Sequence, residues 1–257
     1  MTTTPLLQVR QLNRRFGGLH AVKDVGFDVQ RQHIKAVIGP NGAGKTTLFN
    51  LIAGALAADG GEVIFDGISI SNWPAHRVAG AGLARTFQNV KLFGNMTVLE
   101  NVMVGCHVRS RAGMLAGMFC APHTRREEAR IRARALDLLD LLDIAGLADR
   151  PASELAFGQQ RAVEIARALA LEPRLLLLDE PAAGLNRHET GRLGDLIRKI
   201  RARSITILLV EHDMSLVMDI SDEIVVLSFG EKIAEGRPAE IQRHPEVIRV
   251  YLGDDHA

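Results

Sequence analysis

Short apolar runs and alternating apolar and polar positions mark both ends of the chain, whereas the middle follows a helical pattern. In the first part these runs predict strands over residues 6–12, 21–29, 34–38 and 62–65. A helix is predicted over residues 46–53, and Asp66-Gly67 predicts a tight turn. The rhythm returns after Arg174, with strands predicted over residues 175–178, 204–210 and 224–227 and a helix around residues 193–200. This alternation is typical of an α/β fold.

Between about residue 90 and residue 165 the β-branched runs give way to helical spacing. Thr97 with Glu100, and Thr124 with Glu127, each match a capping box at a helix start. An amphipathic helix is predicted from the apolar residues Ile131, Ala135, Leu138, Leu139 and Leu142. We therefore predict a single domain in which a helical lobe over residues 89–164 is inserted into an α/β core formed by residues 1–88 and 165–257.

Composition and charge narrow the class of protein. The chain has 257 residues, of which 47% are hydrophobic and 24% charged, so a disordered or low-complexity chain is excluded. Its 31 basic and 30 acidic residues leave a net charge of +1, which argues against nucleic acid as a partner. Cys106 and Cys120 stand apart from any Cys/His cluster, so we expect reduced thiols and neither a disulfide framework nor a thiolate zinc site.

The N-terminal segment and the hydropathy of the chain indicate in which cell compartment the protein is expected. The first ten residues lack the charged and then apolar pattern of a secretory signal. No stretch reaches the ~18 apolar residues that a membrane-spanning helix needs. We therefore expect a cytoplasmic chain that does not cross a membrane by itself.

Residues 39–47 satisfy the phosphate-binding pattern G-x-x-x-x-G-K-[ST], between a predicted strand and a predicted helix. Glycines in such a loop let backbone N–H groups turn toward an anion, and the helix N-terminus adds a positive field. The candidate nucleotide-binding residues are Gly39, Pro40, Asn41, Gly42, Ala43, Gly44, Lys45, Thr46 and Thr47. Lys45 is expected to reach the β- and γ-phosphates, and the Thr46 hydroxyl to coordinate Mg²⁺. Kinases, GTPases, helicases and transport ATPases share this loop.

A second apolar strand, over residues 175–178, ends in the adjacent carboxylates Asp179 and Glu180. Ligands of open α/β sheets bind at the carboxyl ends of the strands. Because adjacent strand residues point to opposite faces, the two acids have different tasks. We expect Asp179 to coordinate Mg²⁺, and Glu180 to position and deprotonate the attacking water.

The segment just upstream of this strand separates the phosphate-loop families. It resembles the signature sequence of ATP-binding cassette (ABC) proteins, with the residues Leu155, Ala156, Phe157, Gly158 and Gln159. Other motifs of that family follow in the same order: an adenine-stacking aromatic at Phe16, the Q-loop glutamine at Gln88, a D-loop at residues 183–186 and the switch histidine at His212. The resemblance covers nearly the whole chain. It implies a P-loop NTPase of the ABC ATPase fold, with a RecA-like core, an N-terminal antiparallel β region and an inserted helical lobe.

The resemblance also implies how these residues act. Gln88 would sense the γ-phosphate and ligate Mg²⁺, and His212 would hold the γ-phosphate and the attacking water in line with Glu180. The signature would complete the ATP site of a second subunit paired head to tail. Two residues depart from the family pattern: Ala156 replaces the usual serine, a loss of ~1 kcal/mol for one hydrogen bond, and Asn186 replaces the commoner aspartate of the D-loop.

Four further segments resemble the ATP-binding subunit of bacterial branched-chain amino-acid importers: residues 85–88, 108–126, 181–186 and 250–253. This resemblance implies a second ABC ATPase subunit (a paralogue or another copy), two membrane permeases and, indirectly, a periplasmic solute-binding protein. The chain would then lie peripherally on the inner face of the bacterial cell membrane. The ATPase of a lipopolysaccharide exporter, a urea or amide importer and a soluble ABC ATPase remain alternatives, and nothing in the sequence selects the solute.

Overall fold

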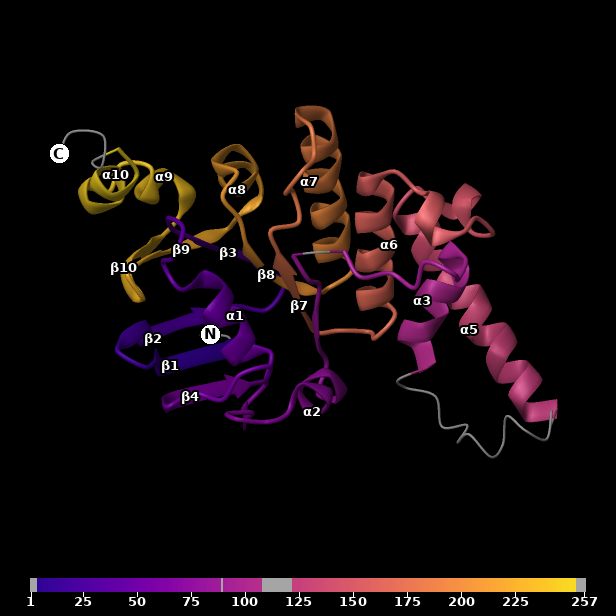
Figure 1. The fold of residues 1–257 in the computed structure, drawn as a ribbon, viewed down its shortest axis with the longest axis horizontal. Coiled ribbons are helices and arrows are strands. Elements are labelled where there is room, and N and C mark those ends of the chain that lie inside the picture. Colours follow the sequence, from indigo (N-terminus) through magenta and orange to yellow (C-terminus); the bar gives the residue numbers. More distant parts are fainter. Residues whose placement is uncertain (1–3, 89, 108–121, 253–257) are drawn as a thin grey trace. The chain divides into compact units, whose positions relative to one another are not determined.

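The computed structural model describes residues 4–88, 90–107 and 122–252, which form two compact units (Figure 1). We call Met1–Arg85 with Arg174–Ala257 the core unit, and Thr86–Pro173 the helical unit. The sequence-based division placed the helical lobe at residues 89–164. The helical unit extends further because helix α6, Phe157–Leu169, runs through residue 164 and stays whole within it.

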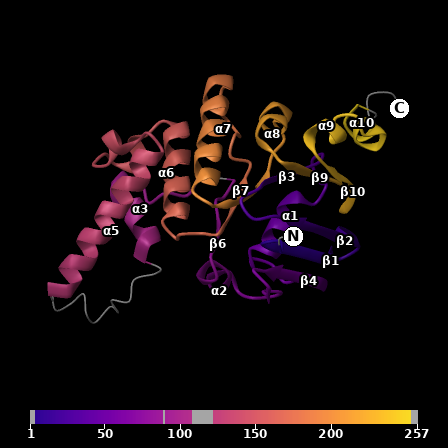
Figure 2. The ribbon, with the colours of Figure 1, turned by 180° about the vertical axis from the view of Figure 1, so that it is seen from behind.

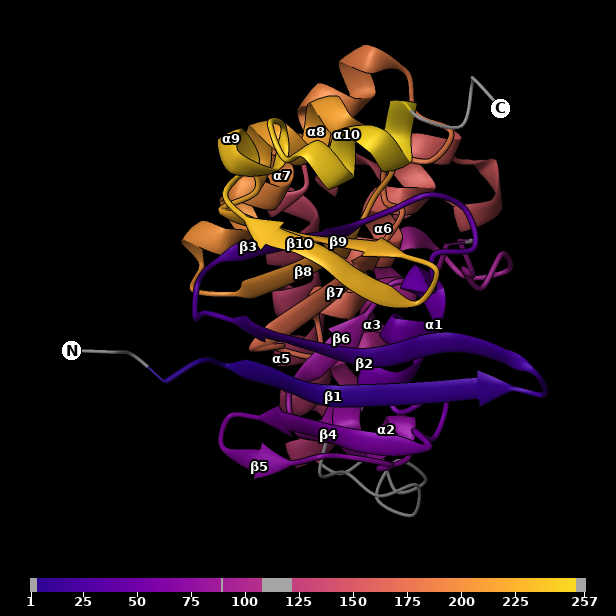
Figure 3. The same cartoon turned by 90° about the vertical axis from the view of Figure 1, so that its left-hand side faces the viewer.

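The N-terminal part of the core unit is an antiparallel sheet, as the family resemblance implied, and its strand order is β2-β1-β4-β5 (Figure 3). Its strands are β1 Leu7–Phe16, β2 Leu19–Val29, β4 Gly60–Phe65 and β5 Ile68–Ser69. The alternation seen in the sequence places Leu7, Val9 and Phe27 in the core, each at most 3% exposed. The strands therefore form because one face of each can be buried.

The second sheet of the core unit has the order β10-β9-β3-β8-β7-β6. Its strands are β3 Ile34–Ile38, β6 Leu83–Arg85, β7 Leu175–Asp179, β8 Thr206–Val210, β9 Glu223–Ser228 and β10 Glu231–Gly236. All neighbours pair in parallel except β9 with β10. The carboxyl ends of β3, β7 and β8 therefore meet at one edge, where the residues that follow these strands can act together.

Helices complete the core unit (Figure 1 and Figure 2). They are α1 Lys45–Ile52, α2 Ala75–Gly80, α7 Arg187–Ala202, α8 Met214–Ile220, α9 Pro238–Ile241 and α10 Pro245–Leu252. Helix α1 begins one residue earlier than predicted and buries Leu48 and Phe49. Helix α7 buries Leu193, Ile197 and Ile200, as its apolar spacing predicts.

The helical unit contains α3 Val98–His107, α5 Pro122–Leu141 and α6, with 3₁₀ turns at Ala145–Leu147 and Ala152–Glu154. The capping box at Thr97 and Glu100 is present: the Glu100 N–H donates to Thr97 Oγ1 at 3.2 Å and the Thr97 N–H to Glu100 Oε2 at 2.8 Å. The box predicted at Thr124 lies outside the described side chains. All five apolar residues of the predicted amphipathic helix are buried. No helix in the described parts of the chain has the length and apolarity needed to cross a membrane.

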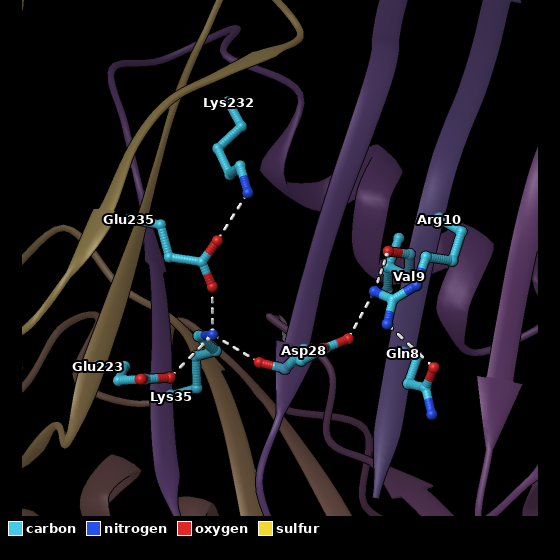
Figure 4. Close-up of polar contacts among 8 residues, drawn as sticks. All are labelled: Gln8, Val9, Arg10, Asp28, Lys35, Glu223, Lys232 and Glu235. Carbon is cyan, nitrogen blue, oxygen red and sulfur yellow. Dashed lines mark hydrogen bonds and ion pairs between the residues drawn. The ribbon is translucent and has the colours of Figure 1, made fainter. Parts of the chain in front are cut away.

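A buried lysine joins the two sheets of the core unit (Figure 4). Lys35 of β3 is 2% exposed, and its ammonium donates to the backbone carbonyl of Asp28 in β2 and to Glu235 of β10, each at 2.5 Å. Glu223 lies 3.0 Å from the same ammonium, and Lys232 donates to the second oxygen of Glu235. Burial favours a higher pKa for Glu235, but the two lysines outweigh it and hold the pKa below its usual value.

Removing the Lys35 charge tests this network. We expect Lys35→Met to lower the free energy of unfolding by about 1–3 kcal/mol, because Glu235 and the Asp28 carbonyl lose a buried donor. Since the folded pKa of Glu235 is depressed, this contribution is present at neutral pH and is lost as the pH falls from about 4.3 through the folded value. Urea unfolding at neutral and acidic pH measures both effects.

Lys232→Met is the matched control, since its ammonium is only partly buried and contacts the same glutamate. A surface pair contributes at most about 1 kcal/mol. Equal losses in the two variants would contradict a special role for Lys35.

Candidate functional site

The loop after β3 has a backbone that only glycine fits at two positions. A Cβ on Gly39 would lie 2.2 Å from the Leu227 carbonyl oxygen, and one on Gly44 would lie 2.2 Å from that of Ala21. The φ angles of Gly42 and Gly44, 80° and 97°, belong to the left-handed region. The loop thus packs closely against the backbones of β2 and of the end of β9.

Helix α1 begins directly after this loop, and no side chain caps it at Gly44. Its first amides therefore point toward the loop without a side-chain acceptor. Lys45 is only 6% exposed, and its ammonium donates to the carbonyl oxygens of Gly39 and Pro40 at 2.7 and 3.0 Å. Thr46 and Asn41 are exposed beside it. Burial lowers the pKa of Lys45, while the charges of Glu180 and Asp179 oppose that shift.

The C-terminal part of the chain contacts the loop as well. The Gly230 N–H donates to the Ala43 carbonyl at 3.1 Å. The Tyr251 hydroxyl, on α10, accepts a hydrogen bond from the Gly39 N–H, and burial raises the pKa of Tyr251 to about 12. Sequence reasoning did not assign Tyr251 to the site, because its only signal was a place in the C-terminal tail.

Asp179 and Glu180 lie at the carboxyl end of β7, as predicted from the sequence. Asp179 is 2% exposed and accepts from the Arg85 guanidinium at 2.7 Å, and Arg85 also donates to Asn50 at 2.6 Å. Glu180 has a φ of 46°, which is costly for a residue with a side chain. Its N–H donates to the Val210 carbonyl at 2.9 Å, so the strained backbone is held against β8.

The residue after β8 carries a carboxylate to which the sequence assigned no role. Glu211 is fully buried, and it accepts from the Ala182 N–H at 2.7 Å, the His212 N–H at 3.0 Å and the Asp213 N–H at 3.3 Å. Burial raises the pKa of Glu211, and these backbone donors oppose the shift. The His212 side chain itself is 62% exposed.

Two further predicted features lie in the core unit: the adenine-stacking candidate Phe16 and the D-loop, residues 183–186. Phe16 is the last residue of β1, and its ring is 44% exposed with the Arg14 guanidinium 4.9 Å from its centre. Asn186, the departure noted in the D-loop, caps α7 by accepting from the amides of His188 and Glu189. An asparagine serves this capping role as well as an aspartate does.

The signature residues form the start of α6 in the helical unit. Ala156 occupies the N-cap and has no side-chain acceptor, so only Gln159 closes the turn, by accepting from the Ala156 N–H at 3.1 Å. Leu155 is buried, whereas Phe157 is 46% exposed. The first turn of α6 therefore keeps its backbone donors available to an anion.

Gln88 is exposed, and α6 holds its backbone. Arg161, 1% exposed, donates to the carbonyl oxygens of Phe87 and Gln88 at 2.7 and 2.9 Å and pairs with Glu164 at 2.9 Å. Glu164 in turn accepts from the Phe87 N–H at 3.1 Å. Sequence reasoning missed this pair, because charged residues on a helix are more often solvated than buried.

The core unit thus brings together the glycine loop, Asp179, Glu180 and the His212 loop, while Gln88 and the signature belong to the helical unit. The core-unit residues fit a Mg²⁺–triphosphate: a glycine-only cradle, a buried ammonium, an exposed hydroxyl and carboxylates at one sheet edge. In the described parts of the chain, no group of three or more His, Cys, Asp or Glu side chains could hold a metal ion.

Comparison with known proteins extends this picture. Residues 22–183 match the family model of the ABC transporter. Residues 231–257 match that of the branched-chain amino acid ATP-binding cassette transporter. The high-affinity branched-chain amino acid transport ATP-binding protein BraF of Pseudomonas aeruginosa is 47% identical over 251 residues, which is 97% of this chain and 98% of BraF.

Solved structures of ATP-binding cassettes resemble this chain over most of its length. The ADP conformation of MJ1267, an ATP-binding cassette of an ABC transporter, has a TM-score of 0.86 at 33% identity and covers 98% of this chain and 100% of its own. The dimeric structure of MJ0796, a bacterial ABC transporter cassette, has a TM-score of 0.76 at 25% identity and covers 90% and 98%. The chain therefore belongs to the ABC transporter family, as an ATPase coupled to transport.

Proposed function

We propose that this chain hydrolyses ATP to energise an importer of branched-chain amino acids. The observation that carries the ATPase part is the buried Lys45 ammonium in a glycine-only loop, at the same sheet edge as Asp179 and Glu180. The solute class rests on the similarity to BraF, a branched-chain amino acid transport ATP-binding protein, and on the family match of the C-terminal residues 231–257. That C-terminal match favours import over the lipopolysaccharide-export alternative.

The glycine loop binds the phosphates of ATP. The loop amides and the N-terminus of α1 accept the negative charge, and Lys45 leaves its two carbonyl partners to reach the β- and γ-phosphates. As the family resemblance implies, Thr46 and Asp179 of the core unit and Gln88 of the helical unit would provide oxygen ligands for Mg²⁺, which would neutralise charge on the phosphates. Phe16 stacks on the adenine, for which its exposed ring is suited.

Hydrolysis needs a base and a group that holds the water in line. Glu180 deprotonates and positions the water, and its strained backbone, fixed against β8, aims the carboxylate. His212 holds the γ-phosphate and the water beside it; its side chain is exposed and therefore able to reach a bound ligand.

A second ATPase subunit, a paralogue or another copy, completes each site. The start of α6 offers backbone donors that face no side-chain cap, and we assign them to the ATP held by the partner subunit. The dimeric structure of MJ0796, a cassette to which this chain is similar, supports such pairing. Two permeases and, through them, a periplasmic solute-binding protein complete the importer, and the chain lies on the inner face of the cell membrane.

The lysine assignment predicts a binding defect. Lys45→Ala should weaken MgATP binding about 10- to 100-fold, because it removes a charge-assisted contact of ~1.5–3 kcal/mol. Isothermal titration calorimetry on the purified chain measures this change. Lys199→Ala, on the exposed side of α7, is the control and should bind as the wild type does. Equal affinities for Lys45→Ala and the wild type would remove the loop from phosphate binding.

The base assignment predicts a catalytic defect with binding retained. Glu180→Gln should cut turnover ~10²-fold or more, the contribution usual for general base catalysis, and leave an ATP-bound dimer that persists. Phosphate release measures turnover, and size-exclusion chromatography with MgATP detects the dimer. Glu62→Gln, at an exposed position of β4, is the matched control. Undiminished turnover in Glu180→Gln would assign the base elsewhere.

A further inference from the structure

Glu211 connects two loops that lie far apart in the sequence. One carboxylate oxygen accepts from the Ala182 N–H at 2.7 Å, and the other accepts from the N–H groups of His212 and Asp213 at 3.0 and 3.3 Å. The carboxylate is completely buried. A buried carboxylate survives only where donors compensate its lost hydration, and here the donors come from both loops.

The loop that contains Ala182 also fixes the backbone of Glu180. The Ala183 N–H donates to the Glu180 carbonyl at 3.1 Å, so the turn closes back on the left-handed residue. The Glu180 N–H is bound to Val210, the residue just before Glu211. Three hydrogen bonds therefore fix the turn around Glu180. The bond from Ala183 closes the turn on itself, and the bonds to Val210 and Glu211 join it to the end of β8.

We propose that Glu211 is a positioning residue that ties the turn at residues 180–183 to the His212 loop, so that the base and the switch histidine take up their catalytic positions together. This inference rests on the ATPase function proposed above. The hydrogen bonds to the Glu211 carboxylate come from backbone N–H groups of the two loops, so we assign it a positioning role and no contact with the reacting atoms. Its effect is on geometry: misplacing reacting groups by about 1 Å can cost ~10²-fold in rate.

Glu211→Asp separates the two halves of the contact. A side chain shorter by one methylene keeps its charge and can still accept from the nearby N–H groups of residues 212 and 213, but it no longer spans to Ala182. Glu211→Gln removes the charge and turns an NH₂ group toward at least one N–H donor. Both variants should lower kcat ~10-fold or more and leave KM and the affinity for MgATP within about twofold of the wild type.

Amide hydrogen exchange tests the contact between Glu211 and the turn at residues 180–183 directly, and it does not depend on ATP turnover. In the full chain without nucleotide, amide exchange in residues 181–184 should become faster in both variants. Exchange in strand β8 should stay unchanged, and exchange in residues 212–215 should stay near the wild-type rate in Glu211→Asp. If Glu211→Gln fails to fold, Glu211→Asp alone carries the test.

Asp222→Asn is the matched control, because Asp222 also accepts a backbone N–H, that of Ile34 at 2.8 Å, at the opposite end of β3. It should lower the melting temperature and leave kcat unchanged. Wild-type kcat in Glu211→Asp and Glu211→Gln, or unchanged exchange in residues 181–184, would overturn the proposal. A parallel loss of kcat and MgATP affinity would also overturn it, in favour of general support of the fold. Failure of the ATPase function itself looks different: the wild type would then neither bind nor hydrolyse MgATP.

Discussion

Parallel pairing of β3, β7 and β8 is the constraint on which the site depends. A parallel sheet aligns the carboxyl ends of its strands, so the residues at the end of each strand are brought close together. The glycine loop and the Glu211-His212 pair follow β3 and β8, and the Asp179-Glu180 pair lies at the end of β7. All three strands are buried along their whole length, so a shift in register would expose apolar residues and is strongly disfavoured.

The parts of the fold that were predictable are those with a local cause. Strand β3 and the helix after it follow from a β-branched run and a glycine loop, and Lys45 and Asp179 follow from their position after apolar strands. The short strand β6 and the edge strand β10 were not predicted, because three residues or a charged edge carry little periodicity. Glu211 follows an apolar strand just as Asp179 does, so the same signal was present there.

Burial of charge explains why the remaining groups escaped sequence reasoning. Lys35, Arg161, Glu164 and Glu211 are at most 2% exposed, whereas charged residues in a sequence are assigned to the surface by default. Each has partners that are distant in the chain, such as Glu235 for Lys35 or Ala182 for Glu211. No local pattern encodes those partners. Only the folded chain shows that the loss of hydration is compensated.

In both units, a buried charged side chain holds a functional loop by hydrogen bonds to the loop backbone. In the core unit a buried carboxylate accepts the Ala182 N–H, and in the helical unit Glu164 accepts the N–H of Phe87 while Arg161 binds the Gln88 carbonyl. These contacts address the loop backbone, so the loop side chains remain available for other tasks. A backbone N–H is also present whatever residue occupies the loop, proline excepted. The loops can therefore vary in side chain while their path is kept, and the cost of burying each charge is offset by several hydrogen bonds.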